Sequence, residues 1–180
     1  MQPIRFRALD AAVDLLGSSG LRALTHARVD ERAGLPRGST SNYFRTRQAL
    51  LAGVVDRIVE RELDAYGPQF SPGSTAEFVD GLCLLFEQTS GTNRTLTAAR
   101  LALFMEAGHD PAIRDAVVRG RAAMESALLP ALVGLGARDP RTSAAAVMAC
   151  FEGLLLHRIA RHDVTDPRPV FSFVVAAAFD

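Results

Sequence analysis

The 180-residue chain contains no lysine, no tryptophan and only two cysteines. Any contact with phosphate would therefore use the planar guanidinium of arginine. Cys83 and Cys150 lie far apart within apolar helical patterns, which fits reduced thiols better than a disulfide framework. The apolar runs fall short of a membrane span, and charged residues interrupt the first one, unlike a signal peptide. We expect a cytoplasmic protein with no membrane partner.

The motifs of common enzymes are absent as well. His157 and His162 are five residues apart, about 140° around a helix, so they do not form the zinc-binding face of a His-x-x-x-His motif. There is no Cys-x-x-Cys pair and no Gly-x-Ser-x-Gly elbow, and the glycines at 134–136 form only a fragment of a nucleotide-binding fingerprint. We expect neither an enzyme nor a bound metal or cofactor.

β-Branched runs bounded by turn residues are few, whereas alanine and leucine are abundant, so the sequence predicts an all-α fold. Apolar periodicity and Gly/Pro breaks predict about nine helices. They cover residues 4–16, 26–33, 36–44, 46 to the Gly67-Pro68 break, 75–90, 94–107, 111–133, 140–163 and 167–179. We expect a three-helix domain at 1–46 and a larger helical domain at 47–180.

Charge is unevenly distributed although the net charge is zero. Residues 1–50 hold eight arginines against four acidic residues, and the remainder holds twelve arginines against sixteen acidic residues. A basic end of this kind points to a polyanionic partner. The alternative is a chance fluctuation of a few charges.

Two short helices joined by a tight turn describe a helix-turn-helix, whose second helix enters the DNA major groove. Thr25 is a suitable N-cap for the first helix. Gly34 suits a left-handed C-cap, and Pro36 suits the first position of the second helix. Thr40 and Phe44 are four residues apart and can both face the core.

The rest of the second helix is polar and matches the chemistry of DNA contacts. Arg37 can reach guanine or a phosphate, Asn42 can bond adenine, and Tyr43 can bond a phosphate. The predicted DNA-contacting set is Thr25, His26, Arg28, Arg37, Gly38, Ser39, Ser41, Asn42, Tyr43 and Arg47. Within it we assign base contacts to Arg37, Ser39 and Asn42, and phosphate contacts to Ser41, Tyr43 and Arg47. The alternative is a solvated polar helix in an ordinary bundle.

The segments "LDAAVDLLGSSGLRALT", "RVDERAGLPRGSTSNYF" and "RTRQALL" resemble the DNA-binding domain of the TetR/AcrR family of transcriptional regulators. The chain departs from the family pattern at Thr40, where leucine is common, and at Ser41, where tyrosine is common. The resemblance implies that residues 47–180 form an all-helical domain for effector binding and dimerisation.

The resemblance also implies a homodimer through the last two helices, whose apolar runs lie at 144–156 and 170–179. Phe171, Val174, Val175 and Phe179 give the last helix an apolar stripe. This stripe faces either a second subunit or the core of its own chain.

An apolar effector pocket would lie among the middle helices. Its candidate lining is Phe78, Phe86, Phe104, Met105, Met124 and Phe151. The alternative for each of these residues is an ordinary place in the core.

The expected function is a repressor that binds a pseudo-palindromic double-stranded operator and is released by a small apolar or amphipathic ligand. Two alternatives remain open. One is a DNA-binding dimer without an effector, and the other is an all-helical small-molecule-binding protein with a vestigial head.

Overall fold

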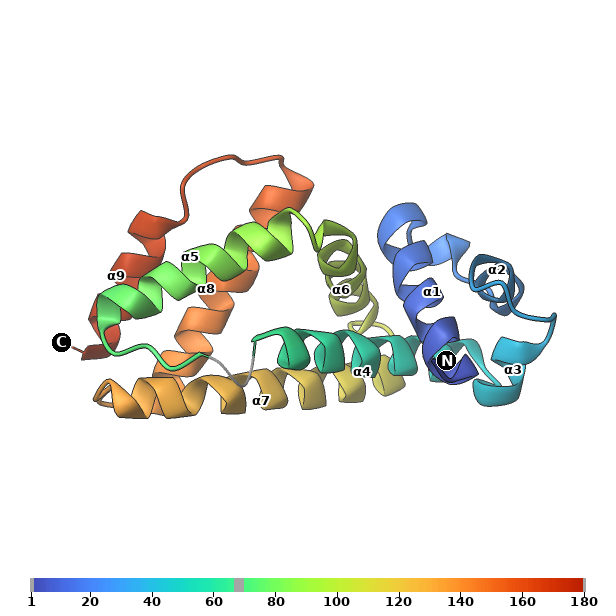
Figure 1. Ribbon diagram of the computed structural model, residues 1–180, viewed down its shortest axis with the longest axis horizontal. Coiled ribbons are helices and arrows are strands. Elements are labelled where there is room, and N and C mark those ends of the chain that lie inside the picture. The colour runs from blue at the N-terminus through green and yellow to red at the C-terminus, as the bar shows by residue number, and fades with distance from the viewer. Residues whose placement is uncertain (1, 67–69, 180) are drawn as a thin grey trace. The chain divides into compact units, whose positions relative to one another are not determined.

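We analysed a computed structural model of the chain, which describes residues 2–66 and 70–179. Throughout these residues the regular structure is helical, which confirms the all-α prediction (Figure 1). The expected end of the fourth helix at Gly67-Pro68 lies outside the described residues. The described helices are α1 (Ile4–Ser19), the 3₁₀ helix η1 (Leu21–Ala23), α2 (His26–Arg32), α3 (Ser39–Tyr43), α4 (Arg47–Tyr66), α5 (Thr75–Ser90), α6 (Arg94–Glu106), α7 (Pro111–Gly134), α8 (Pro140–Ala160) and α9 (Arg168–Phe179).

The chain divides into two compact units that do not follow chain order. Unit 1 comprises Met1–Arg61 and Thr95–Arg121, and unit 2 comprises Glu62–Arg94 and Ala122–Asp180. Unit 1 therefore combines the three N-terminal helices with most of α4, with α6 and with the first part of α7. The functional boundary between residues 46 and 47 stays a prediction.

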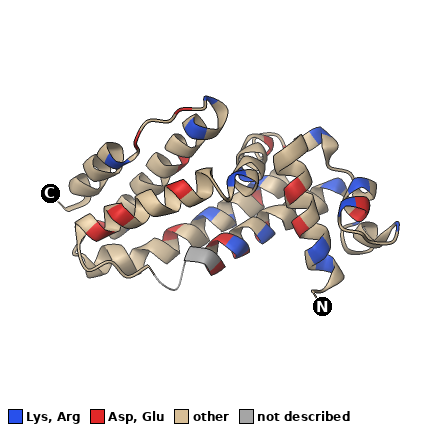
Figure 2. Cartoon of the chain, turned by 45° about the horizontal axis from the view of Figure 1, so that its top comes forward, with Lys and Arg blue, Asp and Glu red and all other residues tan. Residues whose placement is uncertain are grey.

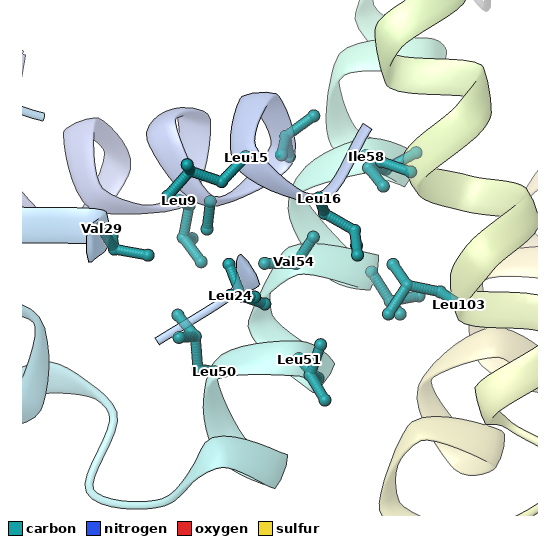
Figure 3. Packing of buried hydrophobic residues seen from close by; sticks show 14 of the residues in the cluster. Leu9, Leu15, Leu16, Leu24, Val29, Leu50, Leu51, Val54, Ile58 and Leu103 are labelled. Carbon is teal, nitrogen blue, oxygen red and sulfur yellow. The ribbon is translucent and has the colours of Figure 1, made fainter. Parts of the chain in front are cut away.

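Unit 1 is built around the apolar faces of α1 and α4. The spacing of Leu9 and Leu16 on α1, and of Leu50 and Val54 on α4, places each pair on one side of its helix. All four side chains are buried, and Val29 of α2 joins them (Figure 3). This core fixes the frame on which the short helices α2 and α3 rest.

The recognition helix α3 starts later than the sequence predicted. We expected Pro36 at its first position, but α3 begins at Ser39. The reason is Gly38, which has a left-handed φ of 89° and cannot continue a helix begun at Pro36. The segment before Gly38 forms a turn, in which the Ser39 amide and hydroxyl both donate to the Pro36 carbonyl. The helix predicted to enter the major groove is therefore only five residues long.

Other boundaries also differ from the prediction, including the end of α8, which lies at Ala160 and not at residue 163. Helix α1 continues through Gly17 to Ser19 and ends at Gly20, whose amide donates to the Leu16 carbonyl. The 3₁₀ helix η1 follows at once and was not predicted, because three residues are too few to show a period. Two predicted caps are confirmed: Thr25 caps α2, and Gly34 is left-handed. At the start of α4, the Thr46 hydroxyl accepts from the Ala49 amide.

Unit 2 is held by aromatic packing among α5, α8 and α9. Phe86, Phe151 and Phe171 form a triangle with ring centroids 5.7–6.0 Å apart. Phe171 and Val175 are fully buried, with exposed fractions of 1% and 2%. Of the two alternatives for the apolar stripe of α9, the structure therefore favours the core of the same chain, because α9 packs against both α5 and α8.

Helix α8 is capped at its start and apolar along its length. The Asp139 side chain accepts from the Thr142 amide at 3.1 Å and from the Thr142 hydroxyl at 2.6 Å. By length and composition, the 21-residue helix α8 is long and apolar enough to cross a membrane. Core helices meet the same criterion, so this property is weak evidence for a membrane span.

Candidate nucleic-acid interface

Most of the predicted DNA-contacting side chains of α3 are available to a partner. The exposed side chains are those of Arg37, Ser41, Asn42 and Tyr43. Thr40 is completely buried, which confirms its expected inward direction. Ser39 is half-buried, and its hydroxyl donates to the Pro36 carbonyl at 2.6 Å. The helix therefore presents a continuous polar surface on the side opposite Thr40.

The structure gives Asp30 of α2 a position that the sequence did not indicate. This carboxylate is 2% exposed and lies against the N-terminus of α3. It accepts from the Gly38 amide at 2.7 Å, from the Thr40 amide at 2.8 Å and from the Thr40 hydroxyl at 2.5 Å. Asp30 was not among the predicted site residues, because a single acidic residue in a short helix is typical of a solvent-exposed face.

The bonds to Asp30 favour its charged form. Burial raises the pKa of a carboxyl group, but the hydrogen bonds from Thr40 and Gly38, with a smaller contribution from His26, outweigh burial here. The pKa of Asp30 accordingly lies below its ordinary value. The α3 N-terminal amides that could have met a DNA phosphate are thus occupied by a carboxylate of the same chain.

Two predicted DNA contacts are engaged within the protein. The His26 Nε2 atom lies 2.6 Å from the carbonyl oxygen of Phe44, just beyond the end of α3. Arg47 donates to the carbonyls of Leu24 at 2.6 Å and Leu21 at 2.8 Å. Arg47 is nevertheless exposed, and its guanidinium has five N–H donors in all, so it keeps donors for a phosphate.

Several arginines around the helix-turn-helix are exposed and without an ion pair among the described residues. They are Arg22, Arg28, Arg37 and Arg45. By contrast, Arg32 lies 3.9 Å from Asp14. Figure 2 shows basic and acidic positions side by side on the N-terminal helices. Arg22 and Arg45 were not in the predicted set; the sequence signal that could have found them is the absence of any acidic residue within four positions of either arginine.

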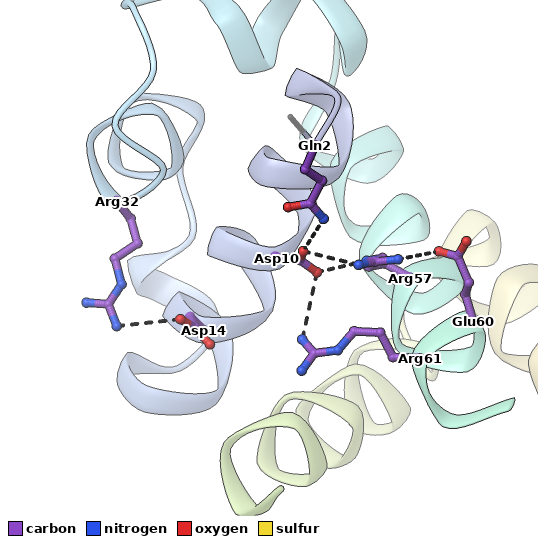
Figure 4. Close-up of polar contacts among 7 residues, drawn as sticks. All are labelled: Gln2, Asp10, Asp14, Arg32, Arg57, Glu60 and Arg61. Carbon is purple, nitrogen blue, oxygen red and sulfur yellow. Dashed lines mark hydrogen bonds and ion pairs between the residues drawn. The ribbon is translucent and has the colours of Figure 1, made fainter. Parts of the chain in front are cut away.

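A polar cluster fixes α1 to α4 beside the helix-turn-helix (Figure 4). Arg57 donates to both carboxylate oxygens of Asp10, at 2.8 and 3.1 Å, and to Glu60 at 2.7 Å. Burial raises the pKa of Asp10, but the hydrogen bonds from Arg57 and Gln2 outweigh it, so this pKa lies below its ordinary value. The Arg57 guanidinium also lies 5.0 Å from the centre of the Phe6 ring. The middle of α4 is therefore held against α1.

The six residues predicted to line an effector pocket fall in both units. Phe78, Phe86 and Phe151 belong to the core of unit 2. The half-buried Met124 is also in unit 2, whereas Phe104 and Met105 lie on α6 in unit 1. The side chain of Met105 is 75% exposed. Among the described residues, no group of three His, Cys, Asp or Glu side chains is placed to hold a metal ion.

A short exposed recognition helix, a basic surrounding surface and a second all-helical unit define the class of helix-turn-helix DNA-binding proteins. Comparison with known proteins then assigns the family. The model of "Bacterial regulatory proteins, tetR family" matches residues 8–54, and the model of "Tetracyclin repressor-like, C-terminal domain" matches residues 73–180. The chain belongs to the TetR family of transcriptional regulators.

Individual relatives support the same assignment. The HTH-type transcriptional regulator BetI of Rhizobium meliloti is 26% identical over 161 residues, covering 88% of this chain and 79% of that protein. BetI of Cronobacter sakazakii is 30% identical over 103 residues, which are 57% of this chain and 51% of that protein. The chain thus matches about half the length of this second relative.

Solved structures share the fold. A TetR-family transcriptional regulator from Rhodococcus sp. superposes with a TM-score of 0.81 at 23% identity, covering 98% of each chain. The multidrug binding protein EbrR, complexed with ethidium, superposes with a TM-score of 0.78 at 23% identity, covering 99% of each chain.

Proposed function

We propose that the protein is a homodimeric repressor that binds a pseudo-palindromic operator and is released from it by a small apolar or amphipathic ligand. The observation that carries the DNA-binding part is a set of exposed arginines around the recognition helix that form no ion pair within residues 2–66 and 70–179: Arg22, Arg28, Arg37 and Arg45. The guanidinium groups of such arginines are available to bind phosphates and bases.

Arg37 is the residue on which this proposal is best tested. It lies directly before Gly38, the N-cap of α3, where a recognition helix first meets the base edges. A duplex selected from a random pool by the wild-type protein would serve as the operator. We expect Arg37→Ala to weaken binding to it by about 1–3 kcal/mol, measured by fluorescence anisotropy.

The matched control is Arg138→Ala, which removes the same charge from an exposed position in unit 2. This variant should bind the selected duplex like the wild type. Equal binding by Arg37→Ala and wild type, in both affinity and salt dependence, would show that the recognition-helix assignment is wrong. It would favour a small-molecule-binding protein with a vestigial head.

The dimer is supported by an apolar surface of α8 that faces solvent in the single chain. Its residues recur every three or four positions, as the seam between packed helices requires. We name this set the dimer stripe: Ala146, Ala149, Gly153, Leu156 and Ala160. Four of these residues are exposed, and a Cβ added at half-buried Gly153 would meet no atom within 4 Å. A partner helix could therefore approach closely at Gly153.

Helix α9 extends the same kind of surface. Phe173 is 77% exposed and Val170 is 40% exposed, while Phe171 between them is buried. Exposed apolar side chains of this kind, a large aromatic one among them, are typical of an interface. A second copy of the chain is the occupant we propose, because a dimer presents two recognition helices to the half-sites of a pseudo-palindrome about 34 Å apart, or a small multiple of that distance.

We expect Phe173→Glu to convert the dimer to a monomer in sedimentation equilibrium and to weaken operator binding. Val164→Glu is the control, because Val164 is 86% exposed but lies in the segment between α8 and α9. An unchanged dimer in Phe173→Glu would rule out this face of α9 as the dimer contact.

The ligand part of the proposal draws on the apolar middle helices and on the likeness to EbrR, a multidrug binding protein whose structure contains ethidium. A ligand releases an operator only if it binds better to the form that binds DNA less well, and the two must then weaken each other equally. The probe is the lipophilic cation tetraphenylphosphonium, which does not intercalate into DNA. Thermal stabilisation of the free protein together with weaker operator binding would support a ligand-gated repressor, whereas no effect across a wider apolar set would favour a dimer without an effector.

A further inference from the structure

Two side chains of α2 hold the recognition helix at its two ends. His26 and Asp30 are four residues apart, so they lie on the same side of α2. Asp30 accepts hydrogen bonds at the N-terminus of α3, and His26 bonds the Phe44 carbonyl just beyond its C-terminus. We call these contacts the polar brace.

The length of α3 makes such a brace necessary. A helix of five residues has few internal hydrogen bonds, so contacts from outside set its direction and its rotation about its own axis. Apolar contacts such as those of Phe44 are not directional. Hydrogen bonds are directional, and bonds to fixed backbone groups at both ends leave the helix little freedom to rotate.

Thr40 connects this brace to the departure of the chain from its family pattern. Where the family commonly has leucine, Thr40 is fully buried and gives both its amide and its hydroxyl to Asp30. A buried hydroxyl needs a partner, and a buried carboxylate needs several. Thr40 and Asp30 therefore satisfy each other, and each residue would be costly without the other.

We propose that Asp30 and His26 are positioning residues for operator recognition: they contact no DNA, but they fix the orientation in which α3 presents Arg37 and Asn42 to the bases. This inference rests on the proposed DNA-binding function. It moves His26 from the predicted DNA-contacting set to the frame that supports it. It also implies that discrimination between bases depends on hydrogen bonds between α2 and α3, on the side of α3 that faces the protein.

The decisive variant is Asp30→Asn, because electrostatics and positioning predict opposite results. Removing a negative charge from the DNA-binding unit should strengthen binding to a polyanion if charge alone matters. Asparagine replaces one carboxylate oxygen of Asp30 with an amide NH₂ group. This group would face the N–H or O–H donors from which that oxygen had accepted hydrogen bonds. We expect the affinity for the selected duplex to fall roughly tenfold or more, the effect of losing a hydrogen bond to a charged group.

Asp14→Asn is the matched control. It removes the same charge from an exposed residue of α1, whose nearest basic partner, Arg32, is 3.9 Å away. Its affinity should match or exceed that of the wild type. The slope of log affinity against log salt should stay unchanged in Asp30→Asn, because no phosphate contact is lost. Its discrimination between the selected duplex and a scrambled duplex should fall.

A second set of variants keeps the test decisive if Asp30→Asn unfolds, which circular dichroism at the assay temperature would reveal. Thr40→Val removes only the hydroxyl and should weaken specific binding about fivefold. Thr40→Ser restores the hydroxyl and should recover most of the affinity. At the other end, His26→Ala should weaken binding and His26→Gln, which keeps a side-chain N–H donor, should recover part of it.

Folded Asp30→Asn, Thr40→Val and His26→Ala proteins that bind the selected duplex like the wild type would overturn the proposal. An equal loss on the selected and the scrambled duplex would also overturn it, because mispositioning affects base contacts more than phosphate contacts. Failure of the proposed function itself looks different: in that case the wild-type protein would select no duplex from the random pool.

Discussion

The helix-turn-helix and unit 2 hold their helices together in different ways. In the helix-turn-helix, the buried carboxylate of Asp30 accepts hydrogen bonds from the Gly38 and Thr40 amides and from the buried Thr40 hydroxyl at the start of the next helix. In unit 2, the triangle of Phe86, Phe151 and Phe171 joins three helices through ring contacts. Directional bonds suit a short helix that must present a fixed surface to DNA, whereas apolar packing supplies stability without fixing each side chain so strictly.

The largest effect is expected where the aromatic packing of unit 2 is interrupted. Phe171→Ala should lower the free energy of unfolding by about 3–5 kcal/mol, since it removes a fully buried ring that touches two others. Chemical denaturation followed by circular dichroism measures the loss. Val164→Ala, at a position 86% exposed, is the control and should change stability by less than about 0.5 kcal/mol. Similar values for both variants would refute the view that the ring cluster stabilises unit 2.

A smaller effect is expected where α1 meets α6 within unit 1. A Cβ added at Gly17 would lie 1.9 Å from the carbonyl oxygen of Thr95, so the backbone itself would have to move. Gly17→Ala should therefore destabilise the protein by about 1–3 kcal/mol despite the higher helix propensity of alanine. Gly134→Ala is the control, because its Cβ would meet nothing within 4 Å and the change should be neutral or stabilising. A gain in stability from Gly17→Ala would mean that α1 and α6 do not approach so closely.

Ion pairs allow the same comparison between the two units. The side chain of Arg57 is 15% exposed and that of its partner Asp10 is 31% exposed, whereas Arg168 and Asp80 of unit 2 are 50% and 62% exposed. Arg57→Ala should cost about 1–2 kcal/mol, between the values for exposed and buried pairs. Arg168→Ala should cost less, and its effect should vanish at high salt. Equal costs in denaturation experiments would show that burial does not distinguish these pairs.

The sequence predicted what depends on local pattern and missed what depends on tertiary partners. The all-helical fold and the inward direction of Thr40 followed from periodicity and spacing, and Thr25 was recognised as a cap from its place before the helix. The partner of Thr40 could not be predicted, because the acceptor is ten residues away on another helix. The buried face of α9 was also ambiguous, since a helix that is apolar on most sides does not show which side is covered.

The candidate site divides in the same way. Arg37 and Asn42 were predicted from residue type, and both are exposed, Arg37 in the turn before α3 and Asn42 on α3 itself. Arg47 was assigned to a phosphate by its charge, yet its guanidinium holds two backbone carbonyls. Geometry of this kind depends on how η1 and α4 meet, and η1 left no periodic signal.

The smallest expected effect is a change in stability at acidic pH. It distinguishes Asp30 of the polar brace from an exposed carboxylate in unit 2. The pKa of folded Asp30 lies below the ordinary value of 3.8, near which the unfolded chain takes up its proton. As the pH falls, the unfolded state therefore binds more protons than the folded state. The stability contributed by the Asp30 carboxylate is complete above pH 3.8 and is lost as the pH drops through the pKa of the folded state. Asp30→Asn should be less stable than wild type at pH 7, and the difference in urea midpoint should shrink toward pH 3.

Asp139→Asn, at an exposed cap in unit 2, should show a weaker trend, because water can replace the bonds of an exposed carboxylate. A difference between wild type and Asp30→Asn that stays constant across this range would mean that the charge of Asp30 is not what holds α3 in place.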